Sequence, residues 1–291
     1  MKLKSEGYLK HKQIRLDFVV GPHSKKRNFV WCTDVHSEFC HGDIMNRWVE
    51  KVKAYQPAGL ILSGDLGTAG SLGNFFKFLE DKFEFPIYFV LGNHDFYGGS
   101  IMEVCNEVRK ICESNKKLIY LDLSKPVALS ENVGLIGHSG WADGKAGSGD
   151  QSPVELNDYV RIREFRDLNI SERHRLMEKL SQISVQHIDK VLPAALDQFK
   201  RVIVVTHAPP FVEAAWYMGN PSEADYLPHF SNPSLGEVIK KHALLYPKKK
   251  ISVLCGHTHS GGVSQILPNL TVYAGTAEYR DPDIHGVITV A

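Results

Sequence analysis

The segment Gly59-Leu60-Ile61-Leu62-Ser63-Gly64-Asp65 places a short apolar run directly before a glycine and an aspartate. An uncharged run of this length, bounded by turn-forming residues, is typical of a buried β-strand. Four more segments repeat the pattern with other polar endings. The apolar runs at 29–33, 86–91, 202–205 and 251–254 lead to Asp34-Val35-His36, Gly92-Asn93-His94-Asp95, His207 and Gly256-His257-Thr258-His259. The chain therefore presents polar side chains just beyond the ends of several predicted strands.

Strands and helices are predicted to alternate along the chain. Further apolar runs at 118–121, 133–136 and 270–273 are also predicted strands. Helices are predicted over 43–55, 72–82, 101–114, 171–199 and 235–245, and Ser171 followed by Glu172 is typical of a capped helix start. This alternation indicates an α/β fold. The strands are continuously rather than alternately hydrophobic, which predicts sheets that are covered on both faces.

The polar residues after the strands are expected to meet in one crevice, because open α/β sheets bind ligands at the carboxyl ends of their strands. In Asp34-Val35-His36 and His257-Thr258-His259, the spacing of two predicts that both side chains of a pair lie on one face of an extended backbone. A site for two divalent cations needs one carboxylate that bridges them, and Asp65 is the natural candidate. The pattern predicts a two-metal hydrolytic site.

The ordered set resembles the signature of the calcineurin-like metallophosphoesterases, which runs D-x-H, G-D, G-N-H-[D/E], H and G-H-x-H. The resemblance covers Phe29 to about Gly275. It implies the metallo-dependent phosphatase fold, a four-layer αββα sandwich of two mixed β-sheets flanked by helices. It also implies two divalent metal ions, and such mixed nitrogen and oxygen ligands suit Mn, Fe, Zn or Co alike. By this resemblance Asp34, His36 and His259 bind one ion, Asn93, His207 and His257 bind the other, and Asp65 binds both.

The same resemblance places His94 near the leaving-group oxygen and implies that it acts as a general acid. Its neighbour Asp95 is grouped with it as catalytic; it either orients His94 or caps the following turn. The implied activity is that of a binuclear metal-dependent phosphoesterase, in which metal-activated water hydrolyses a phosphodiester or a phosphomonoester. Two alternatives stay open: a nuclease of the same superfamily, or a non-catalytic interaction module on the same fold.

Loop residues near the motifs are candidates for contacts with the substrate. They are His41, Tyr97, His138, Trp141 and Trp216. An aromatic ring in such a loop can stack on a leaving group, and it can equally be a loop anchor that packs on the domain. The partner expected of this site is a small-molecule phosphate ester.

Length and composition bound the organisation of the chain. The 291 residues, 43% of them hydrophobic, suit a single domain over 1–291. After Gly140 the sequence becomes rich in Gly, Asp and Ser. This texture predicts a long surface loop, and with the helix that follows it a cap or insert at about 140–200.

Charge and cysteine content narrow the setting. The 34 basic and 33 acidic residues create no net field that favours nucleic acid or an anionic membrane as a partner. Residues 1–12 are polar and lysine-rich, and no window approaches the length of a membrane span, so we expect a cytoplasmic protein. The five cysteines lack C-x-x-C spacing, which argues against a disulfide framework and a thiolate zinc site.

Overall fold

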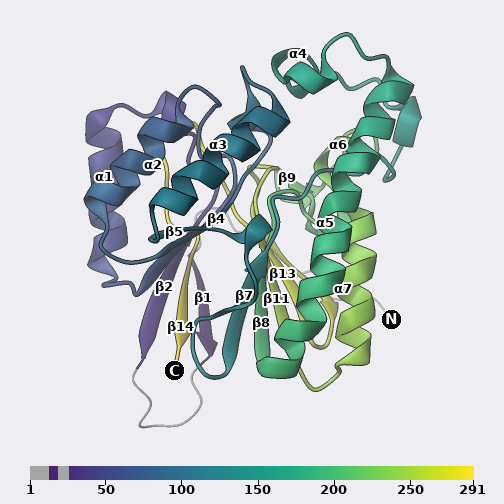
Figure 1. Ribbon diagram of the computed structural model, residues 1–291. Helices are drawn as coiled ribbons and strands as arrows, with labels where there is room; N and C mark the ends of the chain where they lie inside the picture. The colour runs from purple at the N-terminus through teal and green to yellow at the C-terminus, as the bar shows by residue number, and fades with distance from the viewer. Residues whose placement is uncertain (1–12, 19–25) are drawn as a thin grey trace.

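Two six-stranded sheets form the centre of the molecule (Figure 1). The computed structural model describes residues 13–18 and 26–291. The first sheet has the order β1 (Ile14–Phe18), β14 (Gly286–Val290), β2 (Arg27–Cys32), β3 (Gly59–Ser63), β4 (Ile87–Val90) and β5 (Leu118–Tyr120). The second has the order β12 (Gly262–Leu267), β13 (Leu270–Ala274), β11 (Lys250–Cys255), β8 (Arg201–Val205), β7 (Val133–Gly137) and β6 (Val127–Ala128).

Both sheets are mixed. Strands β2 to β5 are parallel in the first sheet, and β7, β8, β11 and β13 are parallel in the second. Antiparallel pairs join β14 to β2, β12 to β13 and β6 to β7. Because neighbouring parallel strands end at the same edge, the residues that follow them can gather there. A small hairpin of β9 (Trp216–Tyr217) and β10 (Asn220–Pro221) lies outside the two sheets.

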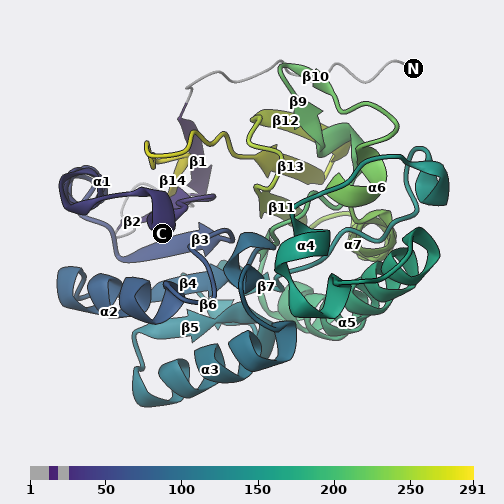
Figure 2. The same ribbon diagram turned by 90° about the horizontal axis from the view of Figure 1, so that it is seen from above.

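Helices cover the outer face of each sheet, as Figures 1 and 2 show from two sides. Helices α1 (Gly42–Ala54), α2 (Leu72–Lys82) and α3 (Ile101–Ser114) cover the first sheet, and α5 (Ile170–Gln198) and α7 (Pro233–Leu245) cover the second. In β3, Leu60 and Leu62 face the helices, whereas Ile61 faces the other sheet. Successive side chains of a strand point to opposite faces, so such a strand has to be apolar throughout. The predicted four-layer αββα sandwich is confirmed.

The eight predicted strands and five predicted helices are all present, with ends shifted by at most a few residues. Four strands of the sheets were not predicted. In β1 only Leu16 and Phe18 are buried, and in β12 only Gly262 and Ser264 are, so neither strand forms a continuous buried apolar run. The two-residue β6 is too short to detect, and β14 is mostly apolar and was simply missed.

The segment from residue 140 to 168 is largely irregular but is not the surface loop that its composition predicts. Trp141, Tyr159, Ile162 and Phe165 are buried in the core between the first sheet and its helices. Only α4 (Asp158–Arg161) and short 3₁₀ turns interrupt the loop. Helix α5 then packs against β7, β8 and α7. That this region acts as a cap over the site stays a prediction.

Helix α5 begins with a different cap from the predicted one. The side chain of Asn169, not Ser171, accepts a hydrogen bond from the Glu172 amide, and the Glu172 carboxylate accepts one from the Asn169 amide. This reciprocal pair is a capping box. Glu172 was identified correctly, and the cap lies two residues earlier than predicted.

Three smaller expectations concern the chain as a whole. All five cysteines are free thiols. No helix in the described ranges, 13–18 and 26–291, has the length and apolar character to cross a membrane. Residues 1–12, on which the expectation of a cytoplasmic protein partly rests, lie outside the described residues.

Candidate metal centre

The predicted ligands gather where the strands of both sheets end, but the backbone there is not extended as the spacing of two suggested. Five of them have a left-handed backbone conformation: Asp34 (φ 49°), His36 (φ 47°), Asp65 (φ 52°), His257 (φ 74°) and His259 (φ 54°). This conformation costs of order 1–3 kcal/mol for a residue with a side chain and persists only where surrounding contacts enforce it. The two residues of each motif reach the metal centre through a tight turn of the chain. They do not project from one face of an extended strand.

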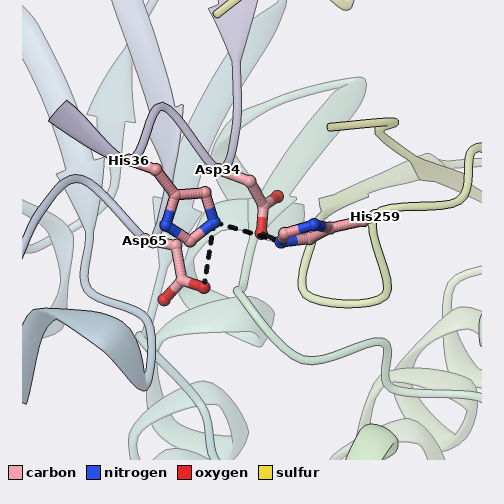
Figure 3. A group of neighbouring side chains, drawn as sticks. All are labelled: Asp34, His36, Asp65 and His259. Atoms are coloured by element: carbon pink, nitrogen blue, oxygen red, sulfur yellow. Dashed lines mark hydrogen bonds and ion pairs between the residues drawn. The ribbon is translucent and has the colours of Figure 1, made fainter. Parts of the chain in front are cut away.

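Four side chains form a first set, comprising Asp34, His36, His259 and the shared Asp65 (Figure 3). His36 Nε2 lies 3.1 Å from His259 Nε2, and His259 Nε2 lies 3.5 Å from Asp34 Oδ1. The other Asp34 oxygen accepts a hydrogen bond from the Thr33 hydroxyl at 2.6 Å. The ligand atoms of this set therefore point toward one another.

A second set comprises Asn93, His207 and His257. Asn93 Oδ1 lies 3.1 Å from His207 Nε2 and 3.0 Å from His257 Nδ1, and the two histidine nitrogens are 3.2 Å apart. The donors come from both sheets, because Asn93 follows β4 whereas His207 and His257 follow β8 and β11. The second set thus lies across the junction of the two sheets.

Asp65 stands between the two sets. Its Oδ2 lies 3.8 Å from His36 Nε2 in the first set, and its Oδ1 lies 3.3 Å from His207 Nε2 in the second. Its Oδ1 also accepts a hydrogen bond from the His94 amide at 2.9 Å. One carboxylate oxygen therefore faces each set, which is the arrangement that a bridging ligand requires.

Hydrogen bonds fix which nitrogen each histidine of the second set presents. His207 Nδ1 donates to the Ser63 carbonyl at 2.9 Å, so Nε2 faces the set. His257 Nε2 donates to the His229 carbonyl at 3.0 Å, so Nδ1 faces the set. A carbonyl partner on the outer nitrogen is the usual support of a metal-binding histidine, because it sets the tautomer and the ring orientation.

Two motif glycines let the loops approach the ligands. A Cβ atom on Gly92 would overlap the Asp65 carboxylate, and one on Gly256 would overlap the carboxylate of Asp34. The motifs need glycine at these positions because any side chain would displace the metal-binding groups.

The donor sets fit divalent cations. Ligand atoms that bind one ion at about 2.0–2.1 Å stand roughly 3 Å apart, close to the separations within each set. In the second set, burial lowers the pKa of His207, but the Asp65 carboxylate outweighs burial and raises that pKa to about 10. Burial, with the charge of His207, lowers the pKa of His257 to about 4. A cation at this set would displace the His207 proton.

His94, the predicted general acid, lies beside the first set. Its ring centroid is 4.5 Å from that of His36 and 4.2 Å from that of Tyr97. Burial lowers the pKa of His94, but the negative charges of Asp65 and Glu38 outweigh it, so the pKa lies above its ordinary value. His94 is therefore biased toward the protonated form that a general acid needs.

Glu38 is a residue of the site that the sequence reasoning missed. One carboxylate oxygen lies 3.4 Å from His36 Nδ1 and 3.6 Å from His94 Nδ1, and Oε2 is buried without a hydrogen-bond partner among the described residues. Burial raises the pKa of Glu38, but the His36 and His94 imidazoles outweigh burial and lower this pKa to about 2. Its position two residues after the D-x-H motif was the signal available in the sequence.

Asp95 takes a different place from the catalytic group to which the sequence assigned it. Its carboxylate accepts hydrogen bonds from the amides of Leu66 and Gly67 at 2.8 Å and from the amide of Gly92 at 2.7 Å. Both oxygens are used in this way, and no hydrogen bond to the His94 ring occurs within the described ranges. Asp95 thus ties the G-D loop to the G-N-H-D loop. Burial and the Asp65 charge raise its pKa to about 7, although the amides of Gly92 and Gly67 oppose this.

Asp158, from the segment after residue 140, orients the amide of Asn93. Asn93 Nδ2 donates to Asp158 Oδ1 at 2.8 Å, and the same oxygen accepts from the Tyr97 hydroxyl at 2.6 Å. With its nitrogen held there, Asn93 presents its oxygen to His207 and His257. No motif marks Asp158, so the sequence offered no signal for it.

The two sets differ in their access to solvent. Asn93, His207 and His257 border a cavity of about 10 Å³, which is lined also by Trp141, Asp158 and His229. That is about the volume of one water molecule. In the first set the His259 side chain is 25% exposed, and the neighbouring Tyr279 is 50% exposed. His259 and Tyr279 therefore give the first set a side that is exposed to solvent.

The five residues predicted to contact substrate are spread over the molecule. Tyr97 is buried between His94 and Asp158. His41 is exposed at the start of α1. His138 lines a separate cavity of about 300 Å³ beside Asp122 and α3. Trp141 stacks on Phe165 in the core and borders both cavities, and Trp216 is buried in the core of the second sheet. Only Tyr97 and Trp141 adjoin the ligands.

Comparison with known proteins gives both a family and a fold. A family model described as calcineurin-like phosphoesterase matches residues 27–261. No curated protein matches the chain in sequence.

Three solved structures share the fold at low sequence identity. A phosphopantetheinyl hydrolase from Mycobacterium tuberculosis is 12% identical with a TM-score of 0.62, over 88% of this chain and 90% of that one. A dimetal phosphatase from Danio rerio is 13% identical with a TM-score of 0.53, over 85% and 86%. The protein TT1561 of Thermus thermophilus is 14% identical with a TM-score of 0.52, over 87% and 90%.

Proposed function

Because this chain belongs to the calcineurin-like phosphoesterase family, we propose that it hydrolyses phosphate esters at a centre for two divalent metal ions. The observation that carries the proposal is the placement of Asp65, which turns one carboxylate oxygen toward His36 and the other toward His207. Asp34, His36 and His259 would hold one ion, Asn93, His207 and His257 the other, and Asp65 both. The ions would be Mn, Fe, Zn or Co, which all accept this donor set.

The ions, when bound, supply a water of lowered pKa and neutralise charge on the phosphate. The chain's own contribution is geometric. The carbonyl groups of Ser63 and His229 hold the outer nitrogens of His207 and His257, and Asp158 holds the amide of Asn93. These contacts fix the ligand atoms before an ion arrives, so little ordering is left to accompany binding.

His94 would protonate the leaving oxygen. The Glu38 carboxylate lies 3.6 Å from His94 Nδ1, so we place the opposite nitrogen, Nε2, toward the substrate. The Tyr97 ring lies 4.2 Å from the His94 ring, centroid to centroid, and restricts its rotation. The proton would pass from His94 Nε2 to the departing alkoxide or phenoxide as the bond to phosphorus breaks.

A phosphodiester suits the centre better than a phosphomonoester. A monoester dianion favours additional cationic side chains around the phosphate. Among the described residues, no lysine or arginine is hydrogen-bonded or ion-paired to the ligands of either set. A small-molecule phosphodiester is therefore the substrate class that we propose, with a monoester as the second candidate because the Danio rerio protein of similar fold is a dimetal phosphatase.

The first experiment is turnover of the metal-reconstituted protein on bis(p-nitrophenyl) phosphate beside p-nitrophenyl phosphate, with metal content measured on the same sample. We expect about two ions per chain and preference for the diester. Preference for the monoester would instead make the protein a phosphatase. Absence of turnover with Mn²⁺, Zn²⁺, Co²⁺ and Fe²⁺ over a broad panel that includes nucleic acids would favour a non-catalytic module.

His94→Ala separates general-acid catalysis from metal binding. On esters with alkyl leaving groups we expect a loss of about 100-fold or more in kcat, since an alkoxide needs protonation to depart. Activated p-nitrophenyl esters should lose much less, and metal content should not change. Equal losses on both classes would assign His94 to binding or to positioning instead.

A further inference from the structure

Tyr279 lies over the first set although it belongs to no motif. Its ring centroid is 4.7 Å from that of His36, 5.1 Å from that of His259 and 6.3 Å from that of His94. The residue is nevertheless 50% exposed. Part of the ring therefore contacts the imidazoles of the centre, and part of it faces solvent at the open side.

The fold holds Tyr279 in this place. It lies in the connection that leaves β13 of the second sheet and returns to β14 of the first. Backbone hydrogen bonds tie that connection to the G-H-T-H loop, from Gly275 to Cys255 at 2.9 Å and from Ala277 to His259 at 3.2 Å. Phe39 packs edge-on against the Tyr279 ring at 5.0 Å. The ring is positioned from several sides, so its exposure is not that of a loose surface residue.

Tyr279 is a neutral phenol at neutral pH, since the ordinary pKa of tyrosine is about 10. A neutral ring at the mouth of the centre offers a face for stacking, and its hydroxyl adds no negative charge that would repel a phosphate.

A cationic group lies against Tyr97, the aromatic neighbour of His94. The Tyr97 ring lies 4.2 Å from His94, and the guanidinium carbon of Arg161 lies 4.8 Å from the Tyr97 ring. Arg161 is exposed and forms no ion pair within the described ranges, 13–18 and 26–291. An arginine held over a ring keeps its N–H groups available for an anion.

We propose that Tyr279 and Arg161 form a leaving-group subsite next to His94, which selects phosphate esters whose leaving group carries a planar aromatic ring and a second negative charge. Tyr279 is the aromatic wall, and Arg161 is the outer cationic end. The inference rests on the proposed function, because that function places the leaving group at His94.

The test uses leaving groups matched in acidity. Benzyl and cyclohexylmethyl phosphates both release a primary alcohol and differ mainly in the flat ring. The 4-carboxybenzyl and 4-methylbenzyl phosphates differ in the added charge. Each is supplied as the monoester or as its methyl diester, according to which class the protein hydrolyses. The corresponding phosphonates, which do not turn over, are measured by calorimetric binding to the metal-loaded protein.

Tyr279→Ala should remove a preference of about 3- to 10-fold for benzyl over cyclohexylmethyl, the size expected of an aromatic contact. Tyr279→Phe keeps the ring and should keep the preference. Arg161→Gln should remove a preference of about 2- to 5-fold for the carboxylate, as for an exposed ion pair. Arg109→Gln is the matched control. Arg109 is also exposed, but it lies in α3, about two turns from the start of that helix at Ile101.

The outcomes separate the subsite from the catalytic proposal. The subsite is supported if the wild-type protein shows these preferences in binding. They should then disappear in Tyr279→Ala and Arg161→Gln and survive in Tyr279→Phe and Arg109→Gln. A wild-type protein without these preferences, or preferences that survive in Tyr279→Ala and Arg161→Gln, would overturn it. Preferential phosphonate binding without turnover of any ester would support the subsite and count against the phosphoesterase activity alone.

Discussion

The two donor sets have similar ligands but different surroundings. The first set, Asp34, His36 and His259, opens to solvent beside Tyr279. The second set, Asn93, His207 and His257, borders a cavity of about 10 Å³ that Asp158 and Trp141 also line. From this difference we expect substrate to approach over the first set, whereas contacts with Ser63, His229 and Asp158 hold the ligands of the second set in the interior. Different carboxylates contact the ligands of the two sets: Glu38 lies beside His36 of the first set, and Asp158 accepts a hydrogen bond from Asn93 of the second.

Asp65→Asn tests whether the two sets work as one centre, and it should have the largest effect. The amide keeps the shape of the side chain but removes the charge that faces both His36 and His207. We expect a loss in kcat on the order of 1,000-fold, because several kcal/mol of transition-state stabilisation depend on paired ions. Circular dichroism should show a folded protein. Turnover near that of wild type would contradict the two-metal centre.

Asp158→Ala tests the support of the second set. Without Asp158, the Asn93 amide can turn its nitrogen toward His207, so we expect one of the two ions to bind about 10- to 100-fold more weakly. Competition with a fluorescent chelator measures both affinities. Asp158→Asn keeps an acceptor for Asn93 and should show a smaller loss.

Glu38→Gln is the matched variant for the first set. We expect this variant to bind the ion of the first set more weakly. We also expect hydrolysis to slow more for esters with poor leaving groups than for activated esters, because Glu38 contacts His94 as well as His36. If Glu38→Gln and Asp158→Ala weakened the same ion, the assignment of the two supports to different sets would be wrong.

Chelation tests the difference in access directly. We expect a strong chelator to remove the ion of the first set at least about tenfold faster, which a difference of about 1.4 kcal/mol in the opening barrier produces. Stopped-flow detection with an indicator should then show two phases. The fast phase should vanish in His259→Ala and the slow phase in His207→Ala. A single phase for both ions would contradict the comparison.

Glu164→Gln tests how firmly the segment that supplies Asp158 to the second set is held, and it should have the smallest effect. Glu164 accepts hydrogen bonds from the Ser100 hydroxyl at 2.6 Å and from the Ile101 amide at 3.0 Å, at the start of α3. We expect a loss of about 1 kcal/mol in the free energy of unfolding, as for other helix caps. Glu103→Gln, which breaks only an exposed pair with Arg163, should cost less.

The effect of Glu164 should depend on pH. Burial raises the pKa of Glu164, but bonds from Ser100 and Ile101 outweigh it, so the pKa lies below its ordinary value of 4.5. A carboxyl group with a lowered pKa in the folded state stabilises the protein above its unfolded pKa, and this stabilisation is lost as the pH falls through the folded value. Chemical denaturation should therefore show wild type and Glu164→Gln converging below about pH 4.5. A constant gap would contradict the ionised cap.

Much of the fold was predictable because of how the strands are buried. Leu60 and Leu62 pack under helices while Ile61 packs against the other sheet, so β3 had to be apolar at every position, and the short continuous runs identified it. The same reasoning failed for β1, which buries only one face. It also failed for residues 140–168, where Trp141 and Phe165 are buried within a stretch whose composition is that of a surface loop.

The sequence by itself was enough to predict the ligand set, because metal binding requires particular side-chain types and motif glycines at fixed local spacing. Gly92 and Gly256 illustrate this, since a Cβ at either would overlap a predicted ligand. Only the tertiary structure decided the roles of Asp95, Asp158 and Tyr279. Those roles depend on contacts through space: Asp95 meets amides of two loops, Asp158 reaches Asn93 across 65 residues, and Tyr279 lies over His36. Hydrogen bonds and ring contacts act over a few ångströms, and local spacing carries no information about which distant segment comes that close.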